Sequence, residues 1–341
     1  MQALFLAITT LVVCQEPTAE SKLSAAAQFP AEWVKLQRLA GGEWKQESED
    51  DLGRFHRFRL GPGKRSLWAH TRDASKLAEW PKSEAVYYWH PGQKITKGIA
   101  VGDSGTLFDG ELHWMDQTMQ VDFAYYLPER DPLSFVSRWE FSGNQSYQWS
   151  LFSKSSAGLT QTGSMRFVHA AQPRPLPEIA PPIFQPSARL KFLDHLTGSW
   201  ELSSKKNVPS KEKSARKKGK KAPSSASVTF RWAAGGEALL IHQMPAEGSK
   251  IPAAEGMVFW HPKQTKVRYL LVDERGAVTE GKLEPVEDVV SFQATRFDGE
   301  VQSTFQERWI GDESSGIRLE REHAASETGK AMAPRVLTRP H

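Results

Sequence analysis

The second half of the chain repeats the first, and this duplication restricts the fold more than any other feature of the sequence. Five separated segments recur in the same order, 156 residues apart at Trp44 and Trp200 and 170 to 172 apart further on. The pairs are 36–44 and 193–200, 58–70 and 230–242, 88–91 and 259–262, Gly105/Gly110 and Gly276/Gly281, and 138–139 and 308–309. Such regular spacing indicates a tandem duplication, so both halves are expected to form the same domain.

The composition excludes several protein classes. Hydrophobic residues make up 39% and charged residues 25% of the 341-residue chain, which is the balance of a globular protein. Cys14 is the single cysteine, so neither an intramolecular disulfide nor a cysteine-based zinc site can form. Apolar runs stay well below the roughly 20 residues that cross a bilayer as a helix. The length is sufficient for two ordinary domains.

Each half consists of short alternating segments separated by Gly, Pro, Asp or Asn, such as 55–60, 65–70 and 85–90. Roughly ten such segments in succession, without helical crossovers, predict an antiparallel up-and-down meander. An amphipathic stretch precedes each meander, at 30–40 and 186–196, and its apolar spacing predicts a short helix that closes one barrel end. The predicted fold is all-β, with two tandem antiparallel meander β-barrels of about ten strands and a short N-terminal helix per repeat.

The N-terminal segment predicts export. Residues 4–13 form an apolar run of ten, followed by polar residues, which suits a secretory signal and is too short to span a membrane. Cleavage after Cys14 gives a secreted or periplasmic protein without a transmembrane span. A lipoprotein acylated on Cys14 is the alternative, which Val13 disfavours because lipoprotein signals have a small residue there.

Composition also marks the domain boundaries. Residues 1–22 are assigned to the signal peptide and a disordered start, 30–170 to the first barrel, 171–186 to a Pro-rich linker and 187–341 to the second barrel. Proline at this density excludes helix and central strand from the linker. The second repeat carries an insertion, the loop 203–225, in which 205–221 hold nine basic residues and one acid. This loop is expected to be solvated.

A short helix followed by Gly-x-Trp at the first strand resembles the lipocalin-like (calycin) barrels, in particular their exported families of unknown function. Gly42-Glu43-Trp44 and Gly198-Ser199-Trp200 carry the resemblance, which covers 30–170 and 187–340. It implies a lumen for a small apolar or amphipathic molecule. The recurring tryptophans are candidate lining residues, with core filling as the alternative: Trp44, Trp89, Trp139, Trp200, Trp260 and Trp309.

Two histidine pairs recur between the repeats, His70 with His242 and His90 with His261. The hairpin ends place His70 opposite about Ala85, which leaves His90 about 16 Å away at ~3.3 Å per residue. A shared metal is therefore not predicted, and no cofactor is predicted either. A polar lumen contact from His70 and His242 remains as an alternative to a structural role.

Two further motifs are interpreted as structural. Gly102-Asp103-Ser104-Gly105 resembles a serine-protease nucleophile motif, but its counterpart in the second repeat has Arg275 at the serine position. A hairpin turn explains the glycines, so no catalytic residue is assigned. Arg138 and Arg308 could hold an anion, yet they alternate with Trp139 and Trp309 and are expected to face outward.

The basic loop could contact an anionic surface through Lys217, Lys218, Lys220 and Lys221. It lacks aromatic residues, which disfavours nucleic acid as a partner. The leading hypothesis is an exported, non-catalytic binding protein with a small hydrophobic molecule in a barrel lumen. The alternatives are an envelope protein with solid barrels that binds anionic surfaces through the loop, and a hydrolase or isomerase that uses a lumen histidine.

Overall fold

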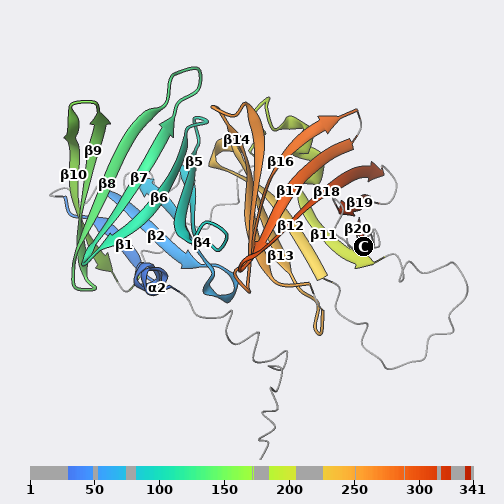
Figure 1. Cartoon of the computed structure of the whole chain (residues 1–341), viewed down its shortest axis with the longest axis horizontal. Helices are drawn as coiled ribbons and strands as arrows, with labels where there is room; N and C mark the ends of the chain where they lie inside the picture. Colours follow the sequence, from blue (N-terminus) through green and yellow to red (C-terminus); the bar gives the residue numbers. More distant parts are fainter. Residues whose placement is uncertain are drawn as a thin grey trace, which may run out of the picture. The chain divides into compact units, whose positions relative to one another are not determined.

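The chain forms an all-β structure (Figure 1). The computed structural model describes residues 30–338, apart from 49–52, 74–81, 171, 173–183, 205–225, 250, 288, 313–315 and 324–334. The first ten strands form a closed antiparallel barrel in which neighbours in sequence are neighbours in the sheet. They are β1 (Glu43–Gln46), β2 (Arg54–Leu60), β3 (Ser66–Asp73), β4 (Ser83–His90), β5 (Ile95–Gly102), β6 (Leu107–Met115), β7 (Thr118–Tyr126), β8 (Leu133–Ser142), β9 (Ser146–Ser155) and β10 (Gly158–Ala170).

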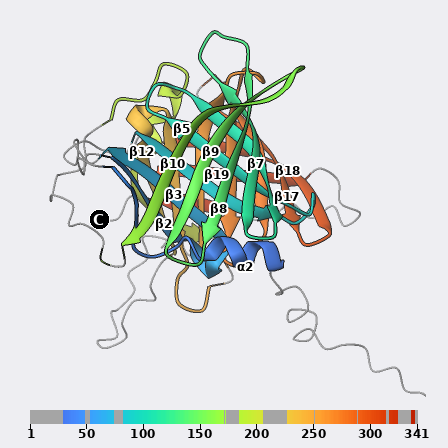
Figure 2. The same cartoon turned by 90° about the vertical axis from the view of Figure 1, so that its left-hand side faces the viewer.

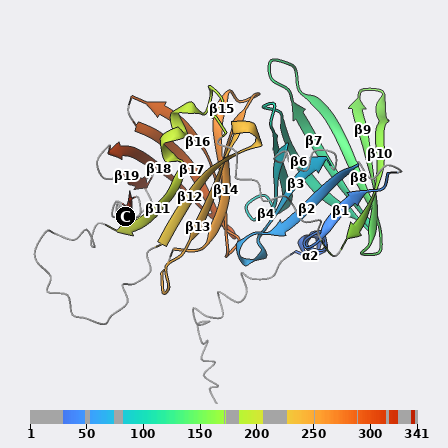
Figure 3. The same cartoon turned by 180° about the vertical axis from the view of Figure 1, so that it is seen from behind.

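The second sheet repeats this order (Figure 3). Nine strands curl round in succession, and the four-residue β20 pairs with both β19 and β11 to complete the ring. The strands are β11 (Gly198–Ser204), β12 (Ala226–Ala233), β13 (Ala238–Met244), β14 (Ala254–His261), β15 (Lys266–Asp273), β16 (Val278–Val286), β17 (Val289–Asp298), β18 (Val301–Asp312), β19 (Gly316–His323) and β20 (Arg335–Thr338).

Short helical segments accompany the barrels. The helix α2 (Ala31–Gln37) lies at one end of the first barrel and buries Trp33 and Leu36 (Figure 2). The corresponding segment before the second barrel is the 3₁₀ helix η3 (Lys191–Leu196), with Leu193 and Leu196 buried. The short helix expected before the second barrel has the 3₁₀ form, in which bonds such as Leu193 N–H to the Leu190 carbonyl span three residues. Two 3₁₀ turns, η1 (Pro62–Lys64) and η5 (Ala234–Gly236), join the second and third strands of each repeat.

Equivalent tryptophans fix the start of each barrel. The indole N–H of Trp44 donates to the Leu39 carbonyl at 2.9 Å, and that of Trp200 donates to the Leu196 carbonyl at 2.6 Å. Both side chains are almost completely buried. A buried indole N–H needs an acceptor. Leu39 follows α2 by two residues and Leu196 ends η3, so each Gly-x-Trp motif ties the plugging segment to its barrel.

The barrels contact each other, and residues 31–341 group into one compact unit. Strands β3 to β7 of the first barrel and β13 to β16 of the second share one buried apolar cluster. Several of these strands therefore bury apolar side chains on both faces, because one face lines the barrel and the other lies against the neighbouring barrel. Among the described residues no helix has the length and apolar character needed to cross a membrane.

Candidate functional site

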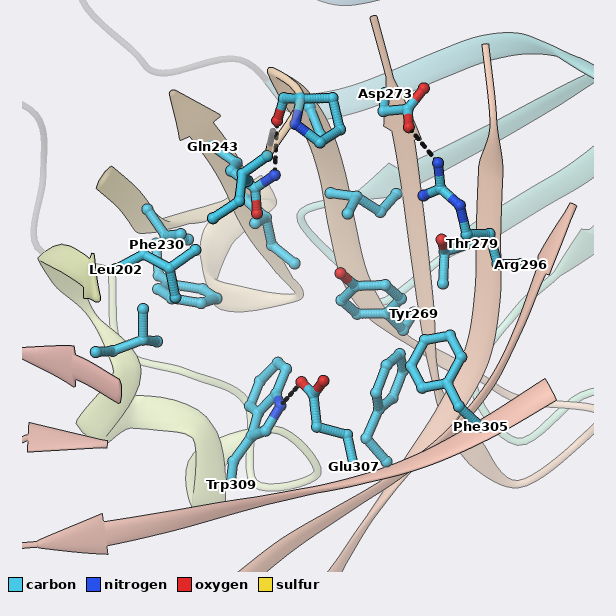
Figure 4. A pocket seen from close by; sticks show the side chains of 18 of the residues that line it. Leu202, Phe230, Gln243, Tyr269, Asp273, Thr279, Arg296, Phe305, Glu307 and Trp309 are labelled. Atoms are coloured by element: carbon cyan, nitrogen blue, oxygen red, sulfur yellow. Dashed lines mark hydrogen bonds and ion pairs between the residues drawn. The ribbon is translucent and has the colours of Figure 1, made fainter. Parts of the chain in front are cut away.

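The second barrel contains a cavity of about 400 Å³, and 13 of its 19 lining residues are apolar or aromatic (Figure 4). The volume lies within the range of small-molecule sites. Strands β11 to β18 and β20 contribute inward-facing side chains. The apolar and aromatic part of the lining consists of Leu202, Val228, Phe230, Ile241, Ile251, Pro252, Ala254, Tyr269, Leu271, Phe292, Phe305, Trp309 and Leu337.

A carboxylate lies in the cavity wall. Glu307 is 6% exposed, and its Oε1 accepts a hydrogen bond of 2.6 Å from the indole N–H of Trp309. Strand β18 alternates, so Phe305, Glu307 and Trp309 face inward while Arg308 is exposed on the outer face. Glu307 therefore adds a carboxylate acceptor to the aromatic surface of the cavity.

Asp273 and Arg296 form an ion pair in the same wall. Oδ2 of Asp273 accepts from Nη2 of Arg296 at 2.6 Å, and Oδ1 accepts from the backbone N–H groups of Arg275 and Ala277. Asp273 is 1% exposed, whereas the Arg296 side chain is 30% exposed and that of Arg275 is exposed. Asp273 thus ties the β15–β16 turn to β17, and the two arginines bring positive charge to the more accessible part of the lining.

The corresponding positions of the first barrel hold larger rings. Strand register aligns Val228, Ile317 and Leu337 with His56, Tyr147 and Phe167 of the first repeat. Tyr147 stacks on Phe167 with ring centroids 5.0 Å apart, and its hydroxyl lies 3.2 Å from Nδ1 of His56. Aromatic rings therefore occupy space in the first barrel that aliphatic side chains leave open in the second.

Burial keeps the polar groups of the first interior neutral. It lowers the pKa of His56 to about 3, with the charges of Arg54 and His70 acting in the same direction. Burial also raises the pKa of Tyr87 to about 12, and it raises the pKa of Tyr147 well above its ordinary value. These three side chains are therefore uncharged at neutral pH.

The six candidate tryptophans divide into three groups. Trp309 lines the cavity. Trp44, Trp139 and Trp200 are buried, and the indole N–H of Trp139 donates to the Ser137 hydroxyl at 3.2 Å. Trp89 and Trp260 are half-buried, and the Arg189 guanidinium lies 5.3 Å from the Trp260 ring centroid. The structure thus brings one predicted tryptophan to the cavity, while the ligand role of all six stays a prediction.

His70 and His242, the alternative candidates for a polar lumen contact, do not face a lumen. Strand β3 pairs His70 with Glu84, not with Ala85, and a one-residue shift moves a side chain to the other face. His242 pairs with Glu255, whose carboxylate lies 2.9 Å from the His242 ring and also binds Arg59 of the first barrel. Both histidines therefore lie on the outer faces where the barrels meet.

The other predicted positions are located as follows. Arg138 faces outward, where its Nε donates to Gln120, and Arg308 is exposed. Ser104 lies in the turn between β5 and β6. Groups of three or more His, Cys, Asp or Glu side chains that could hold a metal do not occur among the described residues. Residues 1–22 and the four loop lysines (217, 218, 220 and 221) lie outside the described part of the chain, so the export and anionic-surface hypotheses stay predictions.

Sequence reasoning missed the polar residues of the cavity. The alternation that places Phe305 and Trp309 inward also places Glu307 inward, so this signal was available. Asp273 and Arg296 carry no comparable signal, because a polar residue near a strand end is usually solvated. His56, the histidine inside the first barrel, follows the same parity as Phe58.

Comparison with known proteins gives limited information. No family model matches the chain, and no curated protein matches it. Among solved structures, a protein of unknown function from the DUF3598 family of Nostoc punctiforme is 12% identical, with a TM-score of 0.24 over 91% of this chain and 98% of that one. A variant of transferrin-binding protein B, a vaccine antigen of Haemophilus parasuis, is 7% identical, with a TM-score of 0.18 over 85% of this chain and 66% of that one. Values this low carry no functional argument.

Proposed function

We propose that this protein is an exported, non-catalytic binding protein that holds a small amphipathic molecule in the cavity of its second barrel. The observation that carries the proposal is the cavity itself, about 400 Å³ in volume, lined by aromatic and aliphatic side chains with a few polar groups. Concave apolar sites with a small number of placed polar groups are typical of small-molecule binding. Export is inferred from residues 4–13.

The lining favours a ligand with a ring or short chain and a polar end. The rings of Phe230, Tyr269, Phe292 and Trp309 offer apolar surface, and burying a ligand's apolar area contributes about 25 cal/mol per Å². The polar end can meet the Glu307–Trp309 pair or the Arg296–Asp273 pair. An unmatched polar group in either place would be costly, so these pairs are expected to set orientation.

The duplication supports a division of roles between the repeats. The first barrel fills its interior with Tyr147 and Phe167, whereas the second has Ile317 and Leu337 at these positions. Core residues of this size stabilise a barrel, and smaller ones in their place cost stability. An open space in the second barrel therefore favours a use for that space. We infer that the second repeat is the binding repeat.

Larger side chains introduced into the cavity lining test the proposal. The probe is 1-anilinonaphthalene-8-sulfonate, whose fluorescence is titrated with the wild type and with the double variant Val228→Phe/Leu337→Phe. Affinity should fall at least about tenfold, because the new rings take the space of the probe. Val301→Phe is the matched control, since this side chain is 68% exposed. Equal probe affinity in the wild type and in a folded double variant would refute the proposal.

A further inference from the structure

We propose that the barrels meet through a self-complementary docking surface, whose partner is a second copy of the same repeat. Within this chain the other half supplies that copy. The docking surface is defined by the buried apolar residues Val86, Tyr88, Ile99, Val101 and Leu107 of the first barrel and Met257, Phe259, Leu270, Val272 and Val278 of the second. Two-fold related surfaces pair in this way in symmetric dimers.

The apolar centre is reciprocal. Each of the five residues on the first barrel is matched by the residue 171 positions later on the second, from Val86 and Met257 to Leu107 and Val278. All ten are at most 8% exposed. Both barrels therefore present the same structural positions to each other, which chance contact between two unrelated faces would not produce.

The polar contacts around this centre are reciprocal as well. Nε2 of His90 lies 3.6 Å from Oε2 of Glu280, and Nε2 of His261 lies 3.6 Å from Oδ2 of Asp109. His261 and Glu280 stand 171 positions after His90 and Asp109. The same two histidine rings meet aromatic rings of the opposite barrel, Phe297 at 4.5 Å and Tyr126 at 4.9 Å between centroids.

A second set of contacts follows the same rule. Arg59 binds Glu255 at 2.7 Å, and the charge of Arg231 acts on Glu84 in the reciprocal place. The η1 and η5 turns also exchange contacts. A Cβ on Gly63 would overlap the backbone of Glu274, and one on Gly235 would lie 3.0 Å from the carbonyl of Asp103. Each turn thus packs against the hairpin after the fifth strand of the opposite repeat.

The polar contacts would also match in a pair of two first repeats or of two second repeats. Two first repeats docked in this way would place His90 against Asp109 and Arg59 against Glu84. Two second repeats would place His261 against Glu280 and Arg231 against Glu255. A histidine or arginine donor meets a carboxyl group in every case, so the docking surface fits either copy of the repeat.

Two contacts nevertheless favour the mixed pair. The Tyr88 hydroxyl donates to Glu280 at 2.6 Å, whereas Phe259 at the equivalent position has no hydroxyl. The charge of Asp273 in the second repeat acts on Arg65 in the first. Glu237 occupies the position of Arg65 in the second repeat, so a pair of second repeats would bring two carboxylates together. These differences select the other half of the chain over a second copy of the second repeat.

Cutting the chain tests the proposal directly. A site for a specific protease is introduced between residues 173 and 183, the full-length protein is purified and cut, and the product is analysed by gel filtration and native mass spectrometry at micromolar concentration. The halves should stay together as a one-to-one pair, with pairs of first repeats as a minor species. Elution as separate, folded halves would overturn the proposal. Pairs of second repeats as abundant as the mixed pair would overturn the selection by Tyr88 and Arg65.

Point variants test the docking contacts without requiring that either half folds in isolation. In the cut protein, Tyr88→Phe should weaken the mixed pair about tenfold, while Tyr125→Phe, on another strand, should not. In the uncut chain, Arg59→Ala and Glu255→Gln are combined in a double-mutant cycle followed by urea unfolding. Their joint effect on the unfolding equilibrium constant should differ from the product of the single effects by about threefold. Independent effects would contradict the docking contact.

Discussion

The buried histidine of the first barrel should make the protein sensitive to mild acid. Burial lowers the pKa of His56 in the folded state to about 3, while the unfolded chain has the ordinary value near 6.5. Below pH 6.5 the unfolded state binds a proton that the folded state does not, so the free energy of unfolding falls as pH decreases. The full difference of about 3.5 pKa units corresponds to about 5 kcal/mol, of which about 3 kcal/mol is lost between pH 7 and 4.5.

The assay is urea unfolding followed by circular dichroism at pH 7 and pH 4.5, with wild type and His56→Gln compared at both values. Glutamine keeps a polar group near the Tyr147 hydroxyl but cannot titrate. The wild type should lose about 3 kcal/mol more than the variant over this interval. His113→Gln is the control, because the His113 side chain is 49% exposed and should leave the loss unchanged. Equal losses in wild type and His56→Gln would refute the reasoning.

Two further predictions concern the contact between the barrels. Burial raises the pKa of Glu84 to about 7 despite the charges of Arg231 and two other arginines, so stability is full below about pH 4.5 and is lost as pH rises to 7. The free energy of unfolding of Glu84→Gln, measured with urea relative to wild type, should therefore rise by about 3 kcal/mol from pH 5 to pH 8. A fall in this difference towards pH 8 would contradict the prediction. Gly63→Ala should destabilise the protein well beyond the roughly 1 kcal/mol expected of Gly143→Ala. Both glycines have a positive φ, but only a Cβ on Gly63 would meet the Glu274 backbone. Equal melting temperatures of the two variants would argue against the contact.

The strand pattern was predictable because one face of most strands is polar. Arg138 and Trp139 occupy opposite faces as their alternation predicts, and the same holds for Arg308 and Trp309. The meander order followed from short Gly-containing turns, such as the one with Gly105 at a positive φ.

The facing of the strands at the docking surface could not be predicted. In β4 both Tyr87 and Tyr88 are aromatic, and one lies in the barrel interior while the other lies between the barrels. Alternation carries little information when both faces are buried, so the sequence left the facing of His70 open, and only the strand register assigns it to the outer face. The 3₁₀ form of 191–196 was equally inaccessible, since the apolar spacing of three to four suits both helix types.

The divergence of the two copies supports the proposed binding role of the second barrel. At the position where the first repeat has Ser137 as the acceptor for Trp139, the second has Glu307 as the acceptor for Trp309. A hydroxyl satisfies an indole N–H at less cost than a buried carboxylate, because the charge must also lose its hydration. A filled barrel has no need for that charge, and Phe167 shows that filling is compatible with this fold. The buried carboxylate of Glu307 therefore lies in the repeat that has the cavity, where it is available to the polar end of the proposed ligand.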